Sequence, residues 1–168
     1  MPLSPASLHA ALSDANKARA HLYLAFFRAL ERRWGRAAAI EAMREAIGAW
    51  GRWQGAGLAA RAGDPFAGLL ESFVLAPDGG RMFEPRVARC DAAGLDAQMM
   101  RCPLKEAWSE AGLADAEIAL LCNIASEADR GALEAAGFAV EIECWEPGKA
   151  GCCALRIRPG EATVPSRG

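Results

Sequence analysis

The chain has 168 residues, of which 52% are hydrophobic, with 19 basic and 21 acidic side chains. The high apolar content and the net charge of −2 exclude a mainly disordered chain, and the balanced charges argue against a cationic surface for nucleic acid. No apolar run approaches the roughly 20 residues of a membrane-spanning helix. We therefore expect neither nucleic acid nor membrane as a partner. Alanine occurs 38 times and favours closely packed helices over a deep core.

Periodicity predicts three helices in the first half of the chain. Apolar side chains recur every three or four residues over residues 13–34 and 36–50, and Gly35 separates these segments as a typical helix stop. A third helix is predicted over residues 65–75, where a proline suits the first turn. Residues 48–57 are rich in glycine and predict a weakly helical stretch. They lack the preceding strand of a phosphate-binding loop.

Residues 77–80, Pro-Asp-Gly-Gly, give the clearest turn signal and the best subdomain boundary. We expect a helical N-terminal subdomain over residues 1–76 and an α+β subdomain with the functional site over residues 77–160. Residues 161–168 are expected to form a flexible tail. The first residues lack the basic and apolar regions of a secretory signal, so we expect a cytoplasmic protein.

The second half mixes extended segments with helices. Residues 81–90 and 96–102 are predicted to be extended, and residues 104–111 to form a short helix. A longer helix is predicted from about residue 115 to residue 136, where Gly137 ends it.

Strict alternation of side chains predicts a β-hairpin over residues 138–145 and 153–158. One face of this hairpin is expected to be buried. The charged residues of the other face are placed to pair across the hairpin, namely Glu141 and Glu143 with Arg156 and Arg158. The predicted class is α+β, with a helical N-terminal half followed by a helix packed on a small antiparallel β-sheet.

One aspartate lies on the apolar stripe of the helix predicted over residues 115–136. Asp129 stands among alanines and leucines at three- and four-residue spacing, and Cys122 lies two turns before it on the same face. A carboxylate on a buried stripe is costly unless it is paired, hydrogen-bonded or facing a cavity. Two interpretations stay open. Asp129 is either a structural carboxylate bonded to a backbone amide or to Arg19, or a carboxylate with a shifted pKa in a small-molecule pocket.

Three cysteines approach the same helix–sheet interface. Cys102 stands at the start of a helix, whose positive end is expected to lower the pKa of its thiol. Cys122 lies on the covering helix, and Cys153 lies on the inward face of the last strand. A thiolate with an acid/base partner such as Asp129 is suited to attack a C=N or acyl carbon. For each cysteine, inert core packing is the alternative interpretation.

Other candidate residues carry weaker signals. Cys90 and Cys144 are expected to be small buried apolar residues in a reducing compartment. No C-x-x-C pair occurs and neither histidine is near a cysteine in sequence, so we expect no metal site. Arg101, next to Cys102, is suited to hold a substrate carboxylate, with a solvated surface arginine as the alternative.

Short motifs are spread over residues 16–158. They are Lys17-Ala18-Arg19-Ala20 with Tyr23, Arg101-Cys102-Pro103-Leu104, Trp108, Gly112-Leu113, Cys122, Asp129, Gly137-Phe138 and a final glycine-bearing turn into a cysteine-bearing strand. In these motifs the chain resembles the L-2-amino-thiazoline-4-carboxylic acid hydrolase family. The resemblance implies a cytosolic bacterial hydrolase that opens a small cyclic amidine-like ring.

The resemblance also implies the site. It maps catalytic roles onto Cys102, Cys122, Asp129 and either Cys153 or Cys152. The chain departs from the family pattern at the last motif, where Gly148-Lys149 precedes two adjacent cysteines and relatives have Gly-Asp before one. Alternation favours Cys153 as the inward thiol, whereas spacing from the glycine favours Cys152. The residues expected to bind the substrate are Arg19, Tyr23, Arg101 and Cys152.

Three hypotheses for the function follow. The first is a hydrolase for a C–N bond in a small cyclic substrate, with a cysteine thiolate, an aspartate acid/base and no cofactor. The second is a non-catalytic small-molecule binding module, and the third is a thiol site for a soft metal. A homo-oligomer is expected because the helical half is rich in alanine and tryptophan.

Overall fold

The computed structural model describes residues 4–58, 65–76 and 78–160. Two long helices, α1 (Pro5–Trp34) and α2 (Arg36–Gly55), lead into a short helix, α3 (Pro65–Leu69), and a π-helix, η1 (Leu70–Val74). The expected tail, residues 161–168, lies outside the described residues, as does Pro77 of the expected turn. The division into subdomains at this turn stays a prediction.

The first two helices are longer than the periodicity predicts. Helix α1 begins at Pro5 because Ser4 caps it, its side chain accepting a hydrogen bond from the amide of Ser7 at 3.1 Å. Gly35, with φ of 84°, ends α1 as expected. Helix α2 runs through the glycine-rich stretch as far as Gly55.

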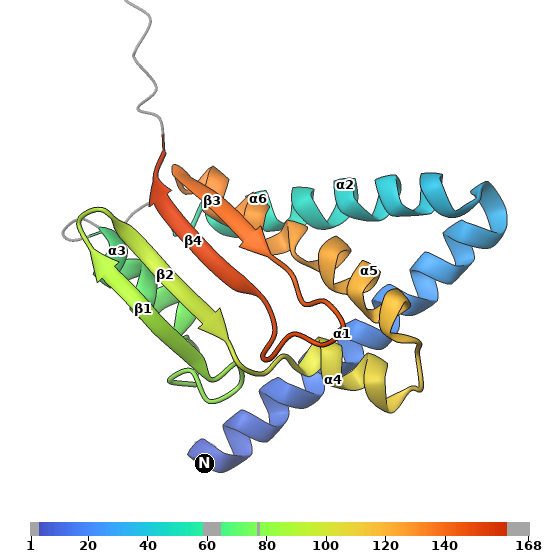
Figure 1. Cartoon of the computed structure of the whole chain (residues 1–168), viewed down its shortest axis with the longest axis horizontal. Helices are drawn as coiled ribbons and strands as arrows, with labels where there is room; N and C mark the ends of the chain where they lie inside the picture. Colours follow the sequence, from blue (N-terminus) through green and yellow to red (C-terminus); the bar gives the residue numbers. More distant parts are fainter. Residues whose placement is uncertain (1–3, 59–64, 77, 161–168) are drawn as a thin grey trace, which may run out of the picture.

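Tertiary packing explains why these glycines are helical. A β-carbon on Gly51 would overlap the carbonyl oxygen of Ala128, and one on Gly55 would overlap that of Ala132. Gly131 likewise faces the backbone of Gly48. The glycines therefore let α2 lie directly against the helix that carries Asp129, as Figure 1 shows for α2 and α6.

The remaining elements follow the predicted order. They are β1 (Pro85–Asp91), β2 (Gly94–Met99), α4 (Pro103–Glu110), α5 (Asp115–Ala125), α6 (Glu127–Ala135), β3 (Phe138–Glu143) and β4 (Ala154–Pro159). The prediction of a single helix over residues 115–136 is wrong in one respect, because the helix is divided at Ser126 into α5 and α6. The hydroxyl of Ser126 donates to the carbonyl of Asn123 at 2.8 Å, a side-chain bond of the kind that bends helices.

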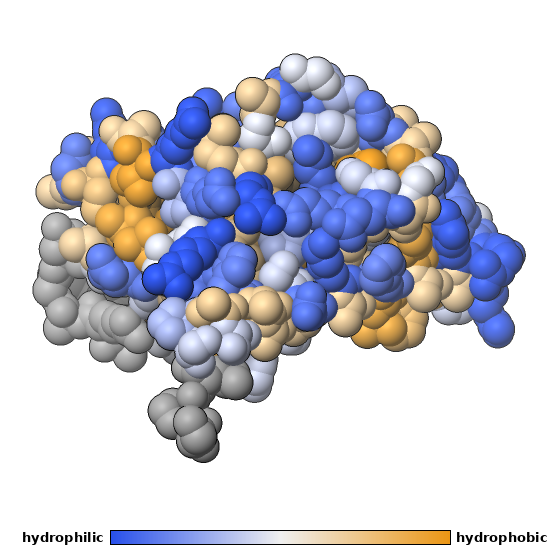
Figure 2. Space-filling view, turned by 90° about the horizontal axis from the view of Figure 1, so that it is seen from below, coloured by the Kyte–Doolittle hydropathy of each residue, from blue (hydrophilic) through white to orange (hydrophobic). Residues whose placement is uncertain are grey.

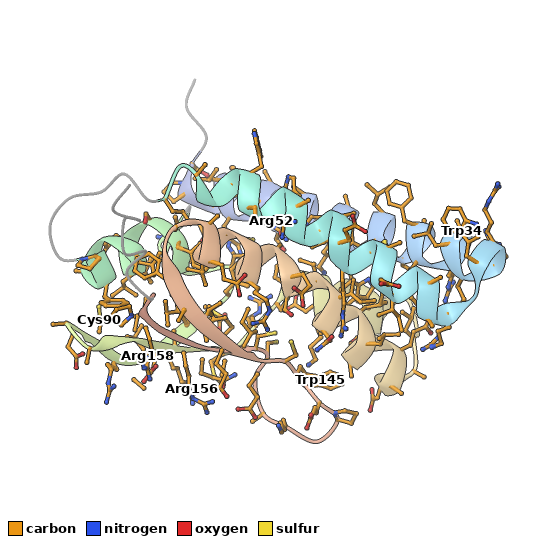
Figure 3. The ribbon with its side chains drawn as sticks, turned by 90° about the horizontal axis from the view of Figure 1, so that it is seen from above. Trp34, Arg52, Cys90, Trp145, Arg156 and Arg158 are labelled. Atoms are coloured by element: carbon orange, nitrogen blue, oxygen red, sulfur yellow. The ribbon has the colours of Figure 1, made fainter. Side chains whose placement is uncertain are left out.

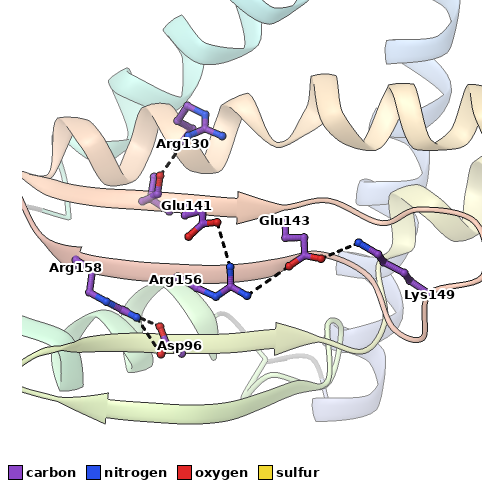
Figure 4. Close-up of polar contacts among 8 residues, drawn as sticks. Asp96, Arg130, Glu141, Glu143, Lys149, Arg156 and Arg158 are labelled. Carbon is purple, nitrogen blue, oxygen red and sulfur yellow. Dashed lines mark hydrogen bonds and ion pairs between the residues drawn. The ribbon is translucent and has the colours of Figure 1, made fainter.

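The four strands form one antiparallel sheet in the order β1-β2-β4-β3. The predicted hairpin is confirmed, with Glu141 opposite Arg156 in the register of β3 and β4. Arg156 pairs with both glutamates, Glu141 and Glu143. The pairing expected for Arg158 is wrong, because its guanidinium binds Asp96 on the neighbouring strand β2 at 2.5 Å (Figure 4).

The α+β class is confirmed. Seen from above, α5 and α6 lie between the strands and the pair α1 and α2 (Figure 3). One hydrophobic cluster joins α1 and α2 to α4 and α5, and a second joins α3 and η1 to Leu133 of α6 and the inner face of the sheet. The face seen from below is mostly hydrophilic, with hydrophobic residues in separate patches (Figure 2). Across the described ranges, no helix is long and apolar enough to cross a membrane.

Candidate functional site

A small cavity lies where α1, α2, α5 and α6 meet the start of α4 and the start of β4. Its volume is about 120 Å³, and we call it the thiol cavity. It brings together six of the residues singled out in the sequence, namely Arg19, Tyr23, Cys102, Cys122, Asp129 and Cys153. A second cavity of about 110 Å³ shares Asp129 and Cys153 with it, so the two adjoin.

Asp129 has an unpaired carboxylate at the cavity wall. Within the described ranges, no hydrogen bond or ion pair satisfies its oxygens, so the structural interpretation through a backbone amide or an Arg19 salt bridge finds no support. Burial raises the pKa of Asp129 to about 6, and the nearby positive charge of Arg19 opposes this rise. A carboxyl that titrates near neutral pH is suited to give and take a proton.

Arg19 of α1 supplies a positive charge to the same cavity. Its guanidinium lies over two aromatic rings, 5.9 Å from the centroid of Tyr23 and 5.6 Å from that of Trp50. One terminal nitrogen donates to the side-chain oxygen of Asn16 at 2.7 Å. The Nε atom is buried and has no hydrogen-bond partner among the described residues. A buried donor without a partner is destabilising unless a ligand accepts from it.

Cys102 lies at the N-cap of α4, as predicted. The expected lowering of the pKa of its thiol is wrong. The amides of Leu104 and Lys105 favour the thiolate, but burial outweighs them and raises the pKa of Cys102. The reason is that the sulfur is enclosed by packed elements, and burial of a charge in an apolar surrounding exceeds the effect of two amides.

Cys122 and Cys153 reach the cavity from opposite sides. Cys122 is buried on α5, and burial raises the pKa of its thiol. Cys153 stands one residue before β4, and Cys144 stands one residue after β3. Cys144 is partly buried.

The other candidates do not line the thiol cavity. Cys152 is buried beside it without lining it, and burial raises the pKa of Cys152 to about 11. The guanidinium of Arg101 is ion-paired with Glu84 at 3.3 Å and with Glu106 at 2.9 Å. The expectation that Cys90 is buried is wrong. It is exposed because β1 is an edge strand with nearly all its residues exposed.

Several cavity residues were not among the candidates expected from the sequence. Trp50 and Gln54 come from α2, Phe73 from η1, and Phe83 from the segment before β1. A further lining residue, Ser126, is buried at the division between α5 and α6. Asp129 was recognised because it is a polar residue on the buried face of a predicted helix. Ser126 has the same signal, whereas the residues from α2, η1 and the segment before β1 do not.

The described residues contain no cluster of three or more His, Cys, Asp or Glu side chains placed to hold a metal ion. The three cavity thiols surround a space without forming a ligand set. The arrangement offers thiols, a carboxyl and an unpaired guanidinium donor around a volume suited to a small polar molecule.

Comparison with known proteins agrees with the motifs. The sequence model of the family described as L-2-amino-thiazoline-4-carboxylic acid hydrolase matches residues 15–157. No curated protein and no solved structure matches the chain. The matched segment covers most of the chain and contains every residue that lines the thiol cavity.

Proposed function

Because the chain belongs to the L-2-amino-thiazoline-4-carboxylic acid hydrolase family, we propose that it hydrolyses a C–N bond in a small cyclic amidine-like substrate held in the thiol cavity. The observation that carries this proposal is the meeting of three thiols, the unpaired carboxyl of Asp129 and the unpaired Nε of Arg19 around one small space. A family name describes the chemistry of relatives. The function of this chain therefore depends on the residues of its own cavity.

The charges of the cavity favour a substrate with two different polar ends. Arg19 offers a buried donor that suits an anionic group such as a carboxylate. Asp129 lies unpaired in the same space and suits the nitrogens of an amidine. Tyr23, whose pKa burial raises, stays a neutral hydroxyl that can donate or accept a hydrogen bond.

Hydrolysis adds one water across the C–N bond. The oxygen of water becomes the carbonyl oxygen on the ring carbon, and its two hydrogens go to the amidine nitrogens, so that the ring nitrogen departs as an amine. A thiol from Cys102, Cys122 or Cys153 attacks the carbon or orients water toward it. Asp129 gives a proton to the nitrogen and later recovers one from water.

A screen of small cyclic amidines and lactams, read by mass spectrometry, tests the proposal. We expect a mass gain of one water for substrates that carry both an amidine and a carboxylate. Single variants Cys102→Ser, Cys122→Ser, Cys153→Ser and Asp129→Asn then identify the groups that act. Wild-type rates in all four variants would overturn the mechanism.

A second candidate function is a non-catalytic binding module. It is favoured by one observation, that burial raises the pKa of both Cys102 and Cys122 and so keeps these thiols protonated. Under this alternative every cavity thiol alkylates slowly at neutral pH in the folded protein. Fast alkylation of one cavity thiol, together with turnover in the screen, supports the hydrolase instead.

A further inference from the structure

The cavity that adjoins the thiol cavity has a mostly hydrophobic wall, and we call it the apolar cavity. Its volume is about 110 Å³. Asp129 and Cys153 supply a carboxyl and a thiol to its wall. The other described residues that line it are all hydrophobic, namely Phe73, Val74, Phe83, Met99 and Leu155. The thiol cavity differs in character, because Arg19 and Gln54 also line it.

The two cavities share one boundary. Asp129 and Cys153 line both of them, together with Phe73 and Phe83. Arg19 lines the thiol cavity and does not line the apolar cavity. A molecule that fills both spaces therefore meets a guanidinium at one end, a carboxyl near its middle and hydrophobic side chains at the other end.

The wide turn of η1 forms one side of the apolar cavity. The amide of Leu75 donates to the carbonyl of Leu70, five residues earlier, at 2.8 Å, which is the hydrogen bond of a π-helix. Phe73 and Val74 are neighbours on this turn, and both line the cavity. Single π-turns are rare and occur frequently at functional sites. The turn thus brings two successive hydrophobic side chains to the same space.

The ends of β2 and β4 form another side of the apolar cavity. Leu155 is buried on β4, in the same hydrophobic cluster as Val74. The amide of Met99 donates to the carbonyl of Cys153 at 2.9 Å, and the amide of Cys152 donates to the carbonyl of Met99 at 2.7 Å. These backbone bonds hold the two strand ends together. The wall is therefore built on the sheet, which gives a binding site a defined shape.

An apolar space of this size is unusual inside a protein. Protein interiors are close-packed, and few voids exceed the size of a water molecule. An ordered water needs about two to four polar partners, whereas the apolar cavity offers polar groups only at the boundary with the thiol cavity. Dry apolar cavities bind small apolar molecules. The space is therefore suited to an alkyl group.

From the shared boundary we infer that the apolar cavity is a subsite for a short alkyl group of the substrate, attached to the exocyclic nitrogen of the amidine. The inference rests on the proposed hydrolase function. It narrows the substrate class to cyclic amidines with a carboxylate at one end and an alkyl group at the other. Arg19 binds the carboxylate, and Asp129 binds the amidine nitrogens. The exocyclic nitrogen, held by Asp129 at the boundary, directs its alkyl group into the apolar cavity.

The volume of the apolar cavity sets the size of this alkyl group. A dry cavity of roughly 150 Å³ accepts benzene, and the apolar cavity is smaller, at about 110 Å³. We therefore expect an isobutyl group to fit this space and a phenyl ring to be too large for it.

Binding of two acyclic amidines tests the subsite with compounds that have no ring to open. N-methylacetamidine and N-isobutylacetamidine carry the same amidine and differ only in the alkyl group on one nitrogen. Their dissociation constants for the full chain are measured by ligand-observed NMR titration. We expect the isobutyl compound to bind at least about tenfold more tightly, because each buried methylene group contributes about fourfold in affinity.

Val74→Phe fills the apolar cavity from the side of η1. We expect it to weaken the binding of N-isobutylacetamidine about tenfold and to leave the binding of N-methylacetamidine unchanged. Val74→Ile is a smaller change and is expected to cause a partial loss of the same kind. Val140→Phe is the matched control, because Val140 packs against the same hydrophobic cluster and lines neither cavity. It should leave the preference for the isobutyl compound unchanged.

Two results would overturn the inference. The first is equal binding of the two amidines by the wild type, or no binding of either. The second is a preference for the isobutyl compound that persists in Val74→Phe when circular dichroism shows that this variant is folded. If Val74→Phe does not fold, an unchanged preference in Val74→Ile overturns the inference equally.

Turnover separates this inference from the hydrolase proposal. The N-isobutyl derivative of L-2-amino-thiazoline-4-carboxylate is expected to have a kcat/KM about tenfold above that of the unsubstituted compound. Ring opening of both compounds at equal kcat/KM, with no preference between the acyclic amidines, would overturn the subsite and leave the hydrolase proposal standing. Preferred binding of the isobutyl amidine without ring opening of any cyclic amidine would overturn the hydrolase proposal and leave the alkyl subsite standing.

Discussion

Asp129 is a residue at which stability and chemistry have opposite requirements. Its carboxyl lines a cavity instead of bonding to the protein, and burial raises its pKa to about 6. A carboxyl with a raised pKa binds more protons in the folded chain than in the unfolded chain. The free energy of unfolding therefore falls as the pH rises through the interval from about 4 to about 6.

Replacement of Asp129 by asparagine removes this partly buried charge. We expect Asp129→Asn to be more stable than the wild type by about 2 kcal/mol at pH 8, and equally stable at pH 4. Hydrolysis is expected to fall by at least about 100-fold. Denaturant unfolding at the two pH values and the turnover assay measure both effects.

Asp96→Asn is the control variant, for which we expect the opposite change in the free energy of unfolding. The ion pair with Arg158 holds the pKa of Asp96 below its usual range. That carboxylate stabilises the fold above its unfolded pKa, and the contribution is lost as the pH falls through its folded pKa. Asp96→Asn should therefore be destabilising at pH 8. Equal stability of Asp129→Asn and the wild type at pH 8 would contradict the assigned environment of Asp129.

Arg19→Lys tests whether the guanidinium of Arg19 binds an anionic group of the substrate. Lysine keeps the charge but lacks the planar set of donors, so the buried Nε donor is lost. We expect KM for carboxylate-bearing substrates to rise about tenfold, with little change for uncharged lactams. Arg28→Lys, an exposed position on the same helix, should leave both values unchanged. Equal losses for charged and uncharged substrates would assign Arg19 a purely structural role.

At the scale of elements, the contact between α2 and α6 sets the shape of the cavity wall. Gly51 and Gly55 face the carbonyls of Ala128 and Ala132, and Asp129 lies between these alanines on α6. Glycine is costly inside a helix, and here it permits an approach that a larger side chain would prevent. The glycine-rich stretch is therefore packing surface, and its position decides where Asp129 stands.

Gly51→Ala is expected to push α6 away from α2. The added methyl group meets backbone, which cannot move aside as a flexible side chain does. A loss of about 2 kcal/mol or more in the free energy of unfolding follows from such overpacking, together with slower turnover as Asp129 shifts. Gly68→Ala on α3 is the control, because nothing lies within 4 Å of its added methyl group. It should be neutral or slightly stabilising.

At the scale of the molecule, the site belongs to no single segment. Arg19 and Tyr23 come from α1, Cys102 precedes α4, Asp129 lies on α6 and Cys153 precedes β4. The first hydrophobic cluster likewise joins the N-terminal helices to α4 and α5. The cavity therefore exists only when the helical layers and the sheet are assembled.

Two exposed apolar residues on α1 are suited to form the contact surface of the expected homo-oligomer. Leu22 and Phe26 lie one turn apart on α1 and are 52% and 53% exposed. We expect the wild type to self-associate in light scattering coupled to size exclusion, and Leu22→Gln with Phe26→Gln to shift it toward the monomer. Val87→Gln, 41% exposed on the edge strand β1, is the control. A wild type that stays monomeric at high micromolar concentration would contradict this expectation.

The sequence by itself determined the class and the hairpin, and it indicated Cys102, Cys122, Asp129 and Cys153 as candidates for one helix–sheet interface. Each follows from periodicity, which depends only on neighbours along the chain. The same local rules missed the division at Ser126, where one side-chain bond interrupts a regular pattern.

Tertiary structure alone decided the chemistry of these residues. Local reasoning placed Cys102 at a helix start and predicted a lowered pKa, but elements distant in sequence enclose the sulfur and raise it. Cys90 was expected to be a buried apolar residue, and only the place of β1 at the edge of the sheet leaves it exposed. Burial and charge proximity depend on every element that packs around a group, so no pattern along the chain contains them.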